Sequence, residues 1–305
     1  MEKNIETIDM NLYRRTGEGA CGASYDCIDD PSQMVKMYNE GFPEQAIIDE
    51  LEVARKVFDA GVKSPEPGRL VTDGKRLGIA FRKIEGKRSF SRMFADEPER
   101  TEEYARELAR LAKGLHSIEC PEGVFPDAKK LSLKMLDALT DITDGQRTCL
   151  KAIIDEIPEC RTALHGDFHF GNVVSTLPKG APLSAPHECF FIDLGNFSSG
   201  CPMLDIAMLT SICEYATEEY IFHDMHIHKS HAHEVLTYFL DEYFFSDDRL
   251  GERMFGKGAD INTVLNAIRP YYCVKAIMID YSIGHMLDES IEAINEEMKL
   301  RGIPA

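Results

Sequence analysis

Short alternating patterns of apolar and polar residues dominate the beginning of the chain. The segments "TGEGACGASYDCI" (16–28) and "QMVKMY" (33–38) contain apolar, aromatic and β-branched residues on either side of the turn "DDPS". Such runs divided by turn residues are typical of a β-hairpin. A further pair of short strands is predicted within residues 68–84. The pattern therefore predicts two antiparallel strand pairs in this part of the chain.

A helical pattern separates these two strand pairs. Apolar residues recur at helical spacing at Ile47, Leu51, Ala54 and Phe58, in a segment that begins with a proline and ends at Gly61. Proline suits the first turn of a helix, and glycine is common just after the last. We therefore expect a helix here, with its apolar face turned toward the core.

The apolar pattern changes near residue 85, where helical spacing becomes dominant. The first long helical pattern is "TEEYARELARLAKGLHSI" (101–118). We therefore expect an α+β protein with two lobes, a small β-rich lobe of residues 1–85 and a larger, mostly helical lobe of residues 86–305. A chain of 305 residues that is 44% hydrophobic can bury enough surface for two lobes.

One hairpin is predicted inside the helical part, and it carries polar residues at its open end. The β-branched run "GNVVST" (171–176) and the run "CFFI" (189–192) are separated by a loop rich in proline. In an antiparallel pair the start of one strand lies beside the end of the other, so Asn172 and Asp193 should meet, with Asp167 in the preceding loop. Carboxylate and amide oxygens suit Mg²⁺, which also binds phosphate oxygens. The sequence thus predicts a nucleotide-phosphate site.

The first lobe contains residues that could cover and neutralise phosphates. Gly17, Gly19 and Gly22 have GxGxxG spacing but lead into a strand, where a dinucleotide-binding fold would need a helix. Glycines between antiparallel strands form a flap whose N–H groups can approach phosphates, and Lys36 on the next strand can pair with them. Glu50 lies on the core-facing side of the predicted helix, so we expect it to hold Lys36.

The motifs around Asp167 and Asp193 carry a resemblance to a known family. "LHGDFHFGN" and "FFIDLGNFSSGCPMLDIA" resemble the catalytic loop and the metal-binding segment of the aminoglycoside phosphotransferase and choline kinase family, relatives of the protein kinases. The resemblance implies a two-lobed protein-kinase-like fold that binds ATP between its lobes, with a hinge near residues 81–86. It also implies that Asp167 is the catalytic base, that Asn172 and Asp193 bind Mg²⁺, and that Asp205 braces the catalytic loop. The implied activity is transfer of the γ-phosphoryl group of ATP to a hydroxyl of a small molecule, such as an aminoglycoside-, choline- or sugar-like acceptor.

Charge and composition narrow the partners further. The formal net charge of −18 argues against a nucleic-acid partner and makes a cationic acceptor more attractive. No run approaches the roughly 20 apolar residues of a membrane span, and the first residues lack the apolar core of a secretory signal, so we expect a cytoplasmic protein with no membrane partner. The nine cysteines are scattered without a CxxC pair, which favours reduced thiols.

Two other functions remain open from the residues alone. A metal-dependent phosphoesterase could use the aspartate and histidines of "GDFH", but it would need a DxH block near its first strand, and the first 115 residues contain no histidine. A non-catalytic nucleotide-binding regulator would bind ATP without turnover. A histidine-rich stretch could bind a transition metal, although we expect a partly exposed helix or loop there. It contains His223, His226, His228, His231 and His233.

Overall fold

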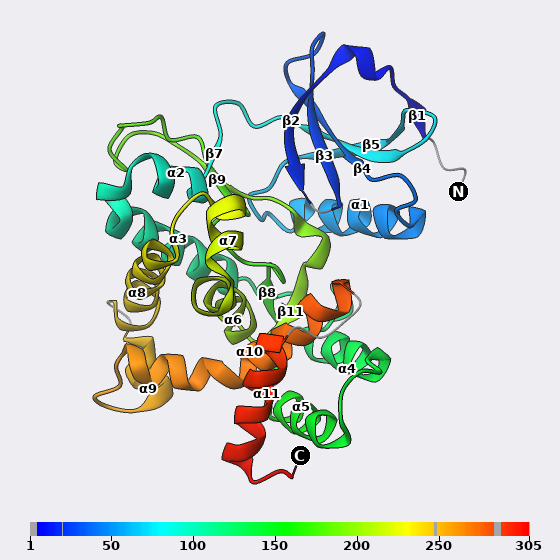
Figure 1. Cartoon of the computed structure of the whole chain (residues 1–305). Coiled ribbons are helices and arrows are strands. Elements are labelled where there is room, and N and C mark those ends of the chain that lie inside the picture. The colour runs from blue at the N-terminus through cyan, green and yellow to red at the C-terminus, as the bar shows by residue number, and fades with distance from the viewer. Residues whose placement is uncertain (1–4, 20, 247–248, 284–287, 305) are drawn as a thin grey trace. The chain divides into compact units, whose positions relative to one another are not determined.

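The structure is a computed structural model that describes residues 5–19, 21–246, 249–283 and 288–304 (Figure 1). The chain divides into two compact units. The first unit combines Met1–Ser89 with Asn172–Asn196, and the second combines Phe90–Gly171 with Phe197–Ala305. The chain thus leaves the first unit, returns to it for one hairpin, and then completes the second. The sequence predicts two domains with a boundary at residue 85, and this boundary stays a prediction.

The first unit is built on a mixed sheet, which in the described residues has six strands in the order β1-β5-β6-β4-β3-β2. β1 runs parallel to β5, and the other neighbours are antiparallel. Both predicted strand pairs are present, whereas the two-residue β1 was not predicted. The strands are β1 (Glu6–Thr7), β2 (Tyr13–Gly19), β3 (Gly22–Cys27), β4 (Gln33–Tyr38), β5 (Pro67–Thr72) and β6 (Leu77–Arg82).

The helix α1 (Glu44–Asp59) packs against one face of this sheet (Figure 1). Its residues Ile47 and Leu51 form a buried cluster with sheet residues. The prediction that Phe58 is on the buried face was wrong, because Phe58 is 39% exposed, whereas Val57, expected on the core-facing side with Glu50, is fully buried. After Gly61, which has a φ of 81°, the N–H of Val62 donates to the Val57 carbonyl oxygen over 3.3 Å, and this bond caps the end of α1.

The segment "LHGDFHFGN" (164–172), which resembles a catalytic loop, is called the catalytic-loop motif. The hairpin predicted to follow it is also present. The strands β9 (Val173–Ser175) and β10 (Cys189–Phe191) are antiparallel, and β7 (Arg88–Ser89) pairs with the other edge of β9. Just beyond the strands, the Ile192 N–H donates to the Asn172 carbonyl oxygen over 2.9 Å. The backbone at Asn172 therefore lies beside the residue that precedes Asp193, as the sequence predicts. A 3-10 helix (Leu194–Asn196) follows.

The second unit is largely helical, which confirms the predicted character of the later part of the chain (Figure 1). The strands β8 (Thr162–Leu164) and β11 (Ser198–Gly200) form an antiparallel pair. The catalytic-loop motif follows β8 along the chain, and α6 follows β11. None of the described helices is both long and apolar enough to span a membrane. The α-helices are α2 (Phe90–Asp96), α3 (Thr101–His116), α4 (Ala128–Ala138), α5 (Asp144–Glu156), α6 (Met203–Thr210), α7 (Glu218–Tyr220), α8 (Lys229–Phe245), α9 (Leu250–Phe255), α10 (Ile261–Ile283) and α11 (Asp288–Arg301).

Candidate functional site

A lysine held by two carboxylates is the central feature of the first unit. The Lys36 Nζ donates to Glu50 Oε1 over 2.9 Å and to Asp193 Oδ1 over 2.8 Å. Burial alone would lower the pKa of Lys36, but the charges of Asp193 and Glu50 outweigh it and hold the pKa above its ordinary value. Lys36 is therefore a fixed positive charge at this place. The prediction that Glu50 holds Lys36 is confirmed by this contact, while the contact with Asp193 was not predicted.

Local structure explains why these three side chains meet. Side chains alternate along β4, so Lys36 and Tyr38 face α1, while Val35 and Met37 belong to the core on the other face of the sheet. Asp193 directly follows the end of the hairpin and has a φ of 59°, in the left-handed region. This unusual backbone conformation turns the chain sharply after β10 and is a form of local strain often found at functional sites.

The predicted glycine flap is the β2–β3 hairpin. Gly17 pairs with Ser24, and Gly19 pairs with Gly22 at the end of the ladder. A Cβ atom on Gly22 would lie only 2.1 Å from the Met37 carbonyl oxygen, so only glycine fits where β3 passes β4. The flap thus belongs to the same sheet as Lys36. Gly22 is on β3, next to the strand of Lys36, and Gly17 and Gly19 are on β2, one strand further along the sheet.

Two oxygen-bearing side chains stand at the open end of the β9–β10 hairpin. Asn172 is buried, with 8% exposure, whereas the Asp193 side chain is 51% exposed. An amide oxygen and a partly exposed carboxylate are suitable donors for Mg²⁺, which keeps several waters and takes the rest of its ligands from phosphate. The donor set at this hairpin therefore fits the ion that the sequence predicts.

The catalytic-loop motif in the second unit is held by a buried carboxylate. Asp205 is fully buried and accepts hydrogen bonds from the backbone N–H groups of His165, over 2.7 Å, and Gly166, over 2.9 Å. His116 Nε2 lies 3.2 Å from the same carboxylate. Burial raises the pKa of Asp205, but the hydrogen bond and charge of His116, with Lys275, bring it below its ordinary value. Asp205 stays ionised and braces the loop.

Asp167 follows this braced segment and is 27% exposed at its side chain. Its backbone N–H donates to His165 Nδ1 over 3.3 Å, and the Gly171 N–H donates to His169 Nδ1 over 3.0 Å. Both histidines therefore use a ring nitrogen to support the loop backbone. His169 Nε2 lies 4.0 Å from the Asp167 carboxylate. Among the described residues, neither histidine belongs to a cluster of three side chains that could hold a metal ion.

Comparison with known proteins assigns the chain to a family. A model of a phosphotransferase enzyme family matches residues 15–222, which is more than half of the chain. The chain belongs to this phosphotransferase family. No curated protein matches it.

Solved structures of phosphotransferases have the same fold. An apo structure of a thermostable mutant of aminoglycoside phosphotransferase APH(4)-Ia has a TM-score of 0.60 at 12% identity, over 96% of this chain and 95% of that chain. An aminoglycoside-3'-phosphotransferase of type VIII has a TM-score of 0.54 at 16% identity, over 87% and 94%. The complex of gentamicin with APH(2'')-IIa has a TM-score of 0.52 at 19% identity, over 95% and 91%. The shared fold therefore extends over nearly the whole of this chain, between 87% and 96% of it in these three comparisons.

The histidine-rich stretch of this phosphotransferase makes protein contacts. His228 Nδ1 lies 2.8 Å from Glu218 Oε1, and His231 Nε2 lies 2.5 Å from the Thr101 hydroxyl. Within the described part of the chain, no three-residue cluster of potential metal ligands includes these histidines. The expectation of a partly exposed helix or loop is confirmed, because the stretch spans a π-helical turn and the start of α8.

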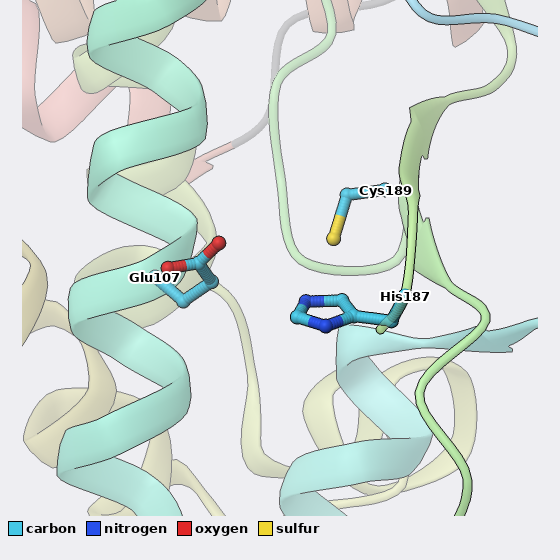
Figure 2. Close-up of side chains that lie close together, drawn as sticks. All are labelled: Glu107, His187 and Cys189. Atoms are coloured by element: carbon cyan, nitrogen blue, oxygen red, sulfur yellow. The ribbon is translucent and has the colours of Figure 1, made fainter. Parts of the chain in front are cut away.

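Another set of potential metal ligands lies elsewhere. Figure 2 shows Cys189, which begins β10, His187 in the loop before this strand, and Glu107 on α3. His187 and Cys189 belong to the first unit and Glu107 to the second. The His187 ring nitrogen Nδ1 donates to the Ala185 carbonyl oxygen over 2.9 Å, which already gives it a role in the loop before β10.

We expect Asp205→Asn to destabilise the phosphotransferase by about 3–5 kcal/mol at pH 7. The single amide oxygen cannot replace the two carboxylate oxygens that accept the loop N–H groups. The substitution also removes the negative charge that balances the buried Lys275. The loss is measured by urea unfolding. Asp127→Ala is the control. This partly exposed aspartate also accepts a backbone N–H, at the start of α4, and its loss should cost only about 1 kcal/mol.

The pH dependence gives a second check on Asp205. A lowered pKa in the folded state means that Asp205 contributes stability above its unfolded pKa, near 3.8, and loses it as the pH falls through the folded value. The difference in unfolding free energy between wild type and Asp205→Asn should therefore shrink below about pH 4. A difference that stays constant into that acidic range would contradict the role of the ionised carboxylate.

Proposed function

We propose that the protein is a small-molecule kinase that transfers the γ-phosphoryl group of ATP to a hydroxyl group of its acceptor. The observation that carries this proposal is the lysine of β4 joined to both Glu50 of α1 and Asp193 after β10. A lysine–glutamate pair together with an acidic residue after a strand is the arrangement by which kinases hold and neutralise nucleotide phosphates. Membership of the phosphotransferase family supports the same activity.

The residues of the first unit bind and orient the nucleotide in this proposal. The backbone of the flap at Gly17, Gly19 and Gly22 covers the phosphates, and Lys36, kept in place by Glu50, neutralises their charge. Asn172 and Asp193 would hold Mg²⁺, which when bound stabilises negative charge on the phosphoryl oxygens. Rate enhancement then comes mainly from positioning and charge stabilisation.

Asp167 in the second unit acts on the acceptor. Its carboxylate orients the acceptor hydroxyl and accepts its proton, while Asp205 and the loop histidines keep the backbone in place. Because the histidines use ring nitrogens for backbone hydrogen bonds, they are support residues in this proposal. The metal-dependent phosphoesterase, which would need them as ligands, is correspondingly disfavoured.

The acceptor is a hydroxylated small molecule, and a cationic one suits the chain best. Tyr220, 42% exposed, and Asp224, also exposed, lie in the second unit. Partial desolvation of the Tyr220 hydroxyl by the groups around it, together with the charges of Asp224 and Asp167, raises the pKa of Tyr220 to about 12. An exposed aromatic ring and an exposed carboxylate on the same helical segment are suitable contacts for a cationic group. The similar solved structures include a ternary complex of an aminoglycoside phosphotransferase with ADP and hygromycin B, and a complex of APH(2'')-IIa with gentamicin.

The direct test is a panel of aminoglycosides, amino alcohols and sugars, assayed for ATP consumption with Mg²⁺. We expect turnover with at least one acceptor and identification of a phosphate monoester product. The metal content is measured in parallel. ATP binding without turnover on any acceptor would favour a regulator, and phosphatase activity with a stoichiometric transition metal would favour the phosphoesterase.

We expect Lys36→Ala and Glu50→Ala to lower kcat/KM by amounts that do not add, because Glu50 acts by placing Lys36. The double variant should be little worse than the worse single variant. Glu52→Ala is the matched control, since this glutamate lies on the exposed side of the same helix. Steady-state kinetics of the four proteins measure the coupling. Fully additive losses would remove the case for the pair.

A further inference from the structure

A lysine is buried in the second unit behind the catalytic-loop motif. Lys275 lies on α10 and is only 2% exposed, and its neighbours Val274 and Ala276 are completely buried. Transfer of an ammonium group to an apolar environment is very unfavourable unless the group is hydrogen bonded and its charge is balanced. A lysine at this position therefore needs specific partners inside the protein.

The partner of Lys275 is the backbone of the loop. Its Nζ donates to the carbonyl oxygen of Gly166 over 2.6 Å. Gly166 has a φ of 84°, a left-handed conformation that suits glycine and turns this carbonyl group inward. The other end of the same peptide group, the N–H of Asp167, donates to His165 Nδ1. The peptide group that joins Gly166 to Asp167 is thus fixed at both its oxygen and its N–H.

Lys275 completes a set of side chains that fix consecutive peptide groups. Asp205 accepts the N–H groups of His165 and Gly166, and Lys275 and His165 hold the peptide group that follows. The ammonium also interacts with the negative charges of Asp205 and Asp167, which partly offset the desolvation that lowers its pKa. Hydrogen bonding and charge therefore both link Lys275 to the segment that ends at Asp167.

We propose that Lys275 is a positioning residue for Asp167. Lys275 acts through the Gly166 carbonyl group and thereby fixes the direction in which the Asp167 carboxylate points. This inference rests on the proposed function, since it assigns a role relative to the base. Lys275 does not contact acceptor or nucleotide in this proposal. A small error in the placement of a catalytic group can cost about 10²-fold in rate, which is the scale of the effect we expect.

The kinetic test combines Lys275→Met with Asp167→Asn. Lys275→Met should lower kcat by about 10²-fold and leave the Kd of Mg·ATP unchanged, because the proposed nucleotide-binding residues belong to the first unit. In the Asp167→Asn background the same change should cost little, since Lys275 then has no base to position. Arg269→Gln, elsewhere on α10, is the control and should keep the wild-type kcat. Additive losses, or an unchanged kcat in Lys275→Met, would overturn the proposal.

A second measurement does not depend on any acceptor. Hydrogen exchange of peptides containing residues 165–167 should be faster in Lys275→Met than in wild type and in Arg269→Gln, because the loop loses one of its supports. If Lys275→Met does not fold, Lys275→Gln, which keeps an N–H donor without the charge, takes its place in both experiments. Unchanged exchange in the loop would also overturn the proposal. A wild-type protein with no turnover on any acceptor would instead reject the proposed function, and the exchange experiment would still test the support of the loop.

Discussion

We expect Asp167→Asn to keep the fold and the affinity for Mg·ATP while kcat falls by about 10²–10⁴-fold, the range that a positioned general base typically contributes. Asparagine has nearly the same shape as aspartate but cannot accept the proton of the acceptor hydroxyl as a carboxylate does. The backbone hydrogen bond from residue 167 to His165 would survive the substitution, because it uses the main-chain N–H. Nucleotide affinity, unfolding free energy and kcat are measured on the same preparation.

His169→Gln is the matched control for this prediction. It lies in the same loop, and its Nδ1 accepts a hydrogen bond from the Gly171 N–H, so its loss should weaken the loop without removing the base. We expect a smaller decrease in kcat than in Asp167→Asn and no change in bound metal. If His169→Gln instead released a stoichiometric transition metal from a protein with phosphatase activity, the kinase assignment would be wrong.

The predictable parts of the site depend on local sequence patterns. Glu50 could be assigned to Lys36 because helical spacing alone decides which side of α1 faces the core, and the strand pattern places Lys36 on a neighbouring element. The meeting of Asn172 with the residues before Asp193 follows in the same way from antiparallel pairing across a short hairpin. Each of these inferences needed only the period of one element and the identity of its neighbour.

The contacts that were missed join segments far apart in the chain. Lys36 and Asp193 are 157 residues apart, and their hydrogen bond depends on the return of the chain to the first unit and on the left-handed backbone of Asp193. Neither can be obtained from the period of an apolar pattern. Lys275 did leave a signal, a single lysine within the apolar run "CVKAIMI", since lysine is almost never fully buried unless it is paired. Its partner, a loop carbonyl group 109 residues earlier, left none.

The second large effect is expected at the proposed metal site. Asp193→Ala should reduce Mg²⁺-dependent nucleotide affinity by more than the roughly 10–100-fold that loss of an outer-shell partner costs at a metal site, because it removes a direct ligand. The effect on stability should be small, since the Asp193 side chain is half exposed and its ion pair with Lys36 is worth about 0–1 kcal/mol. Titration of nucleotide at several Mg²⁺ concentrations measures the loss.

A control must separate metal binding from the contact with Lys36, because Asp193 takes part in both. Lys36→Met removes the lysine but leaves the carboxylate, so nucleotide affinity should fall while its dependence on Mg²⁺ concentration persists. Glu188→Ala, on the same hairpin, removes a carboxylate that pairs with Lys63 at the surface and should change neither property. A Mg²⁺ dependence that is unchanged in Asp193→Ala would show that the open end of the β9–β10 hairpin does not bind the metal, and Lys36 would then be the main reason for the position of Asp193.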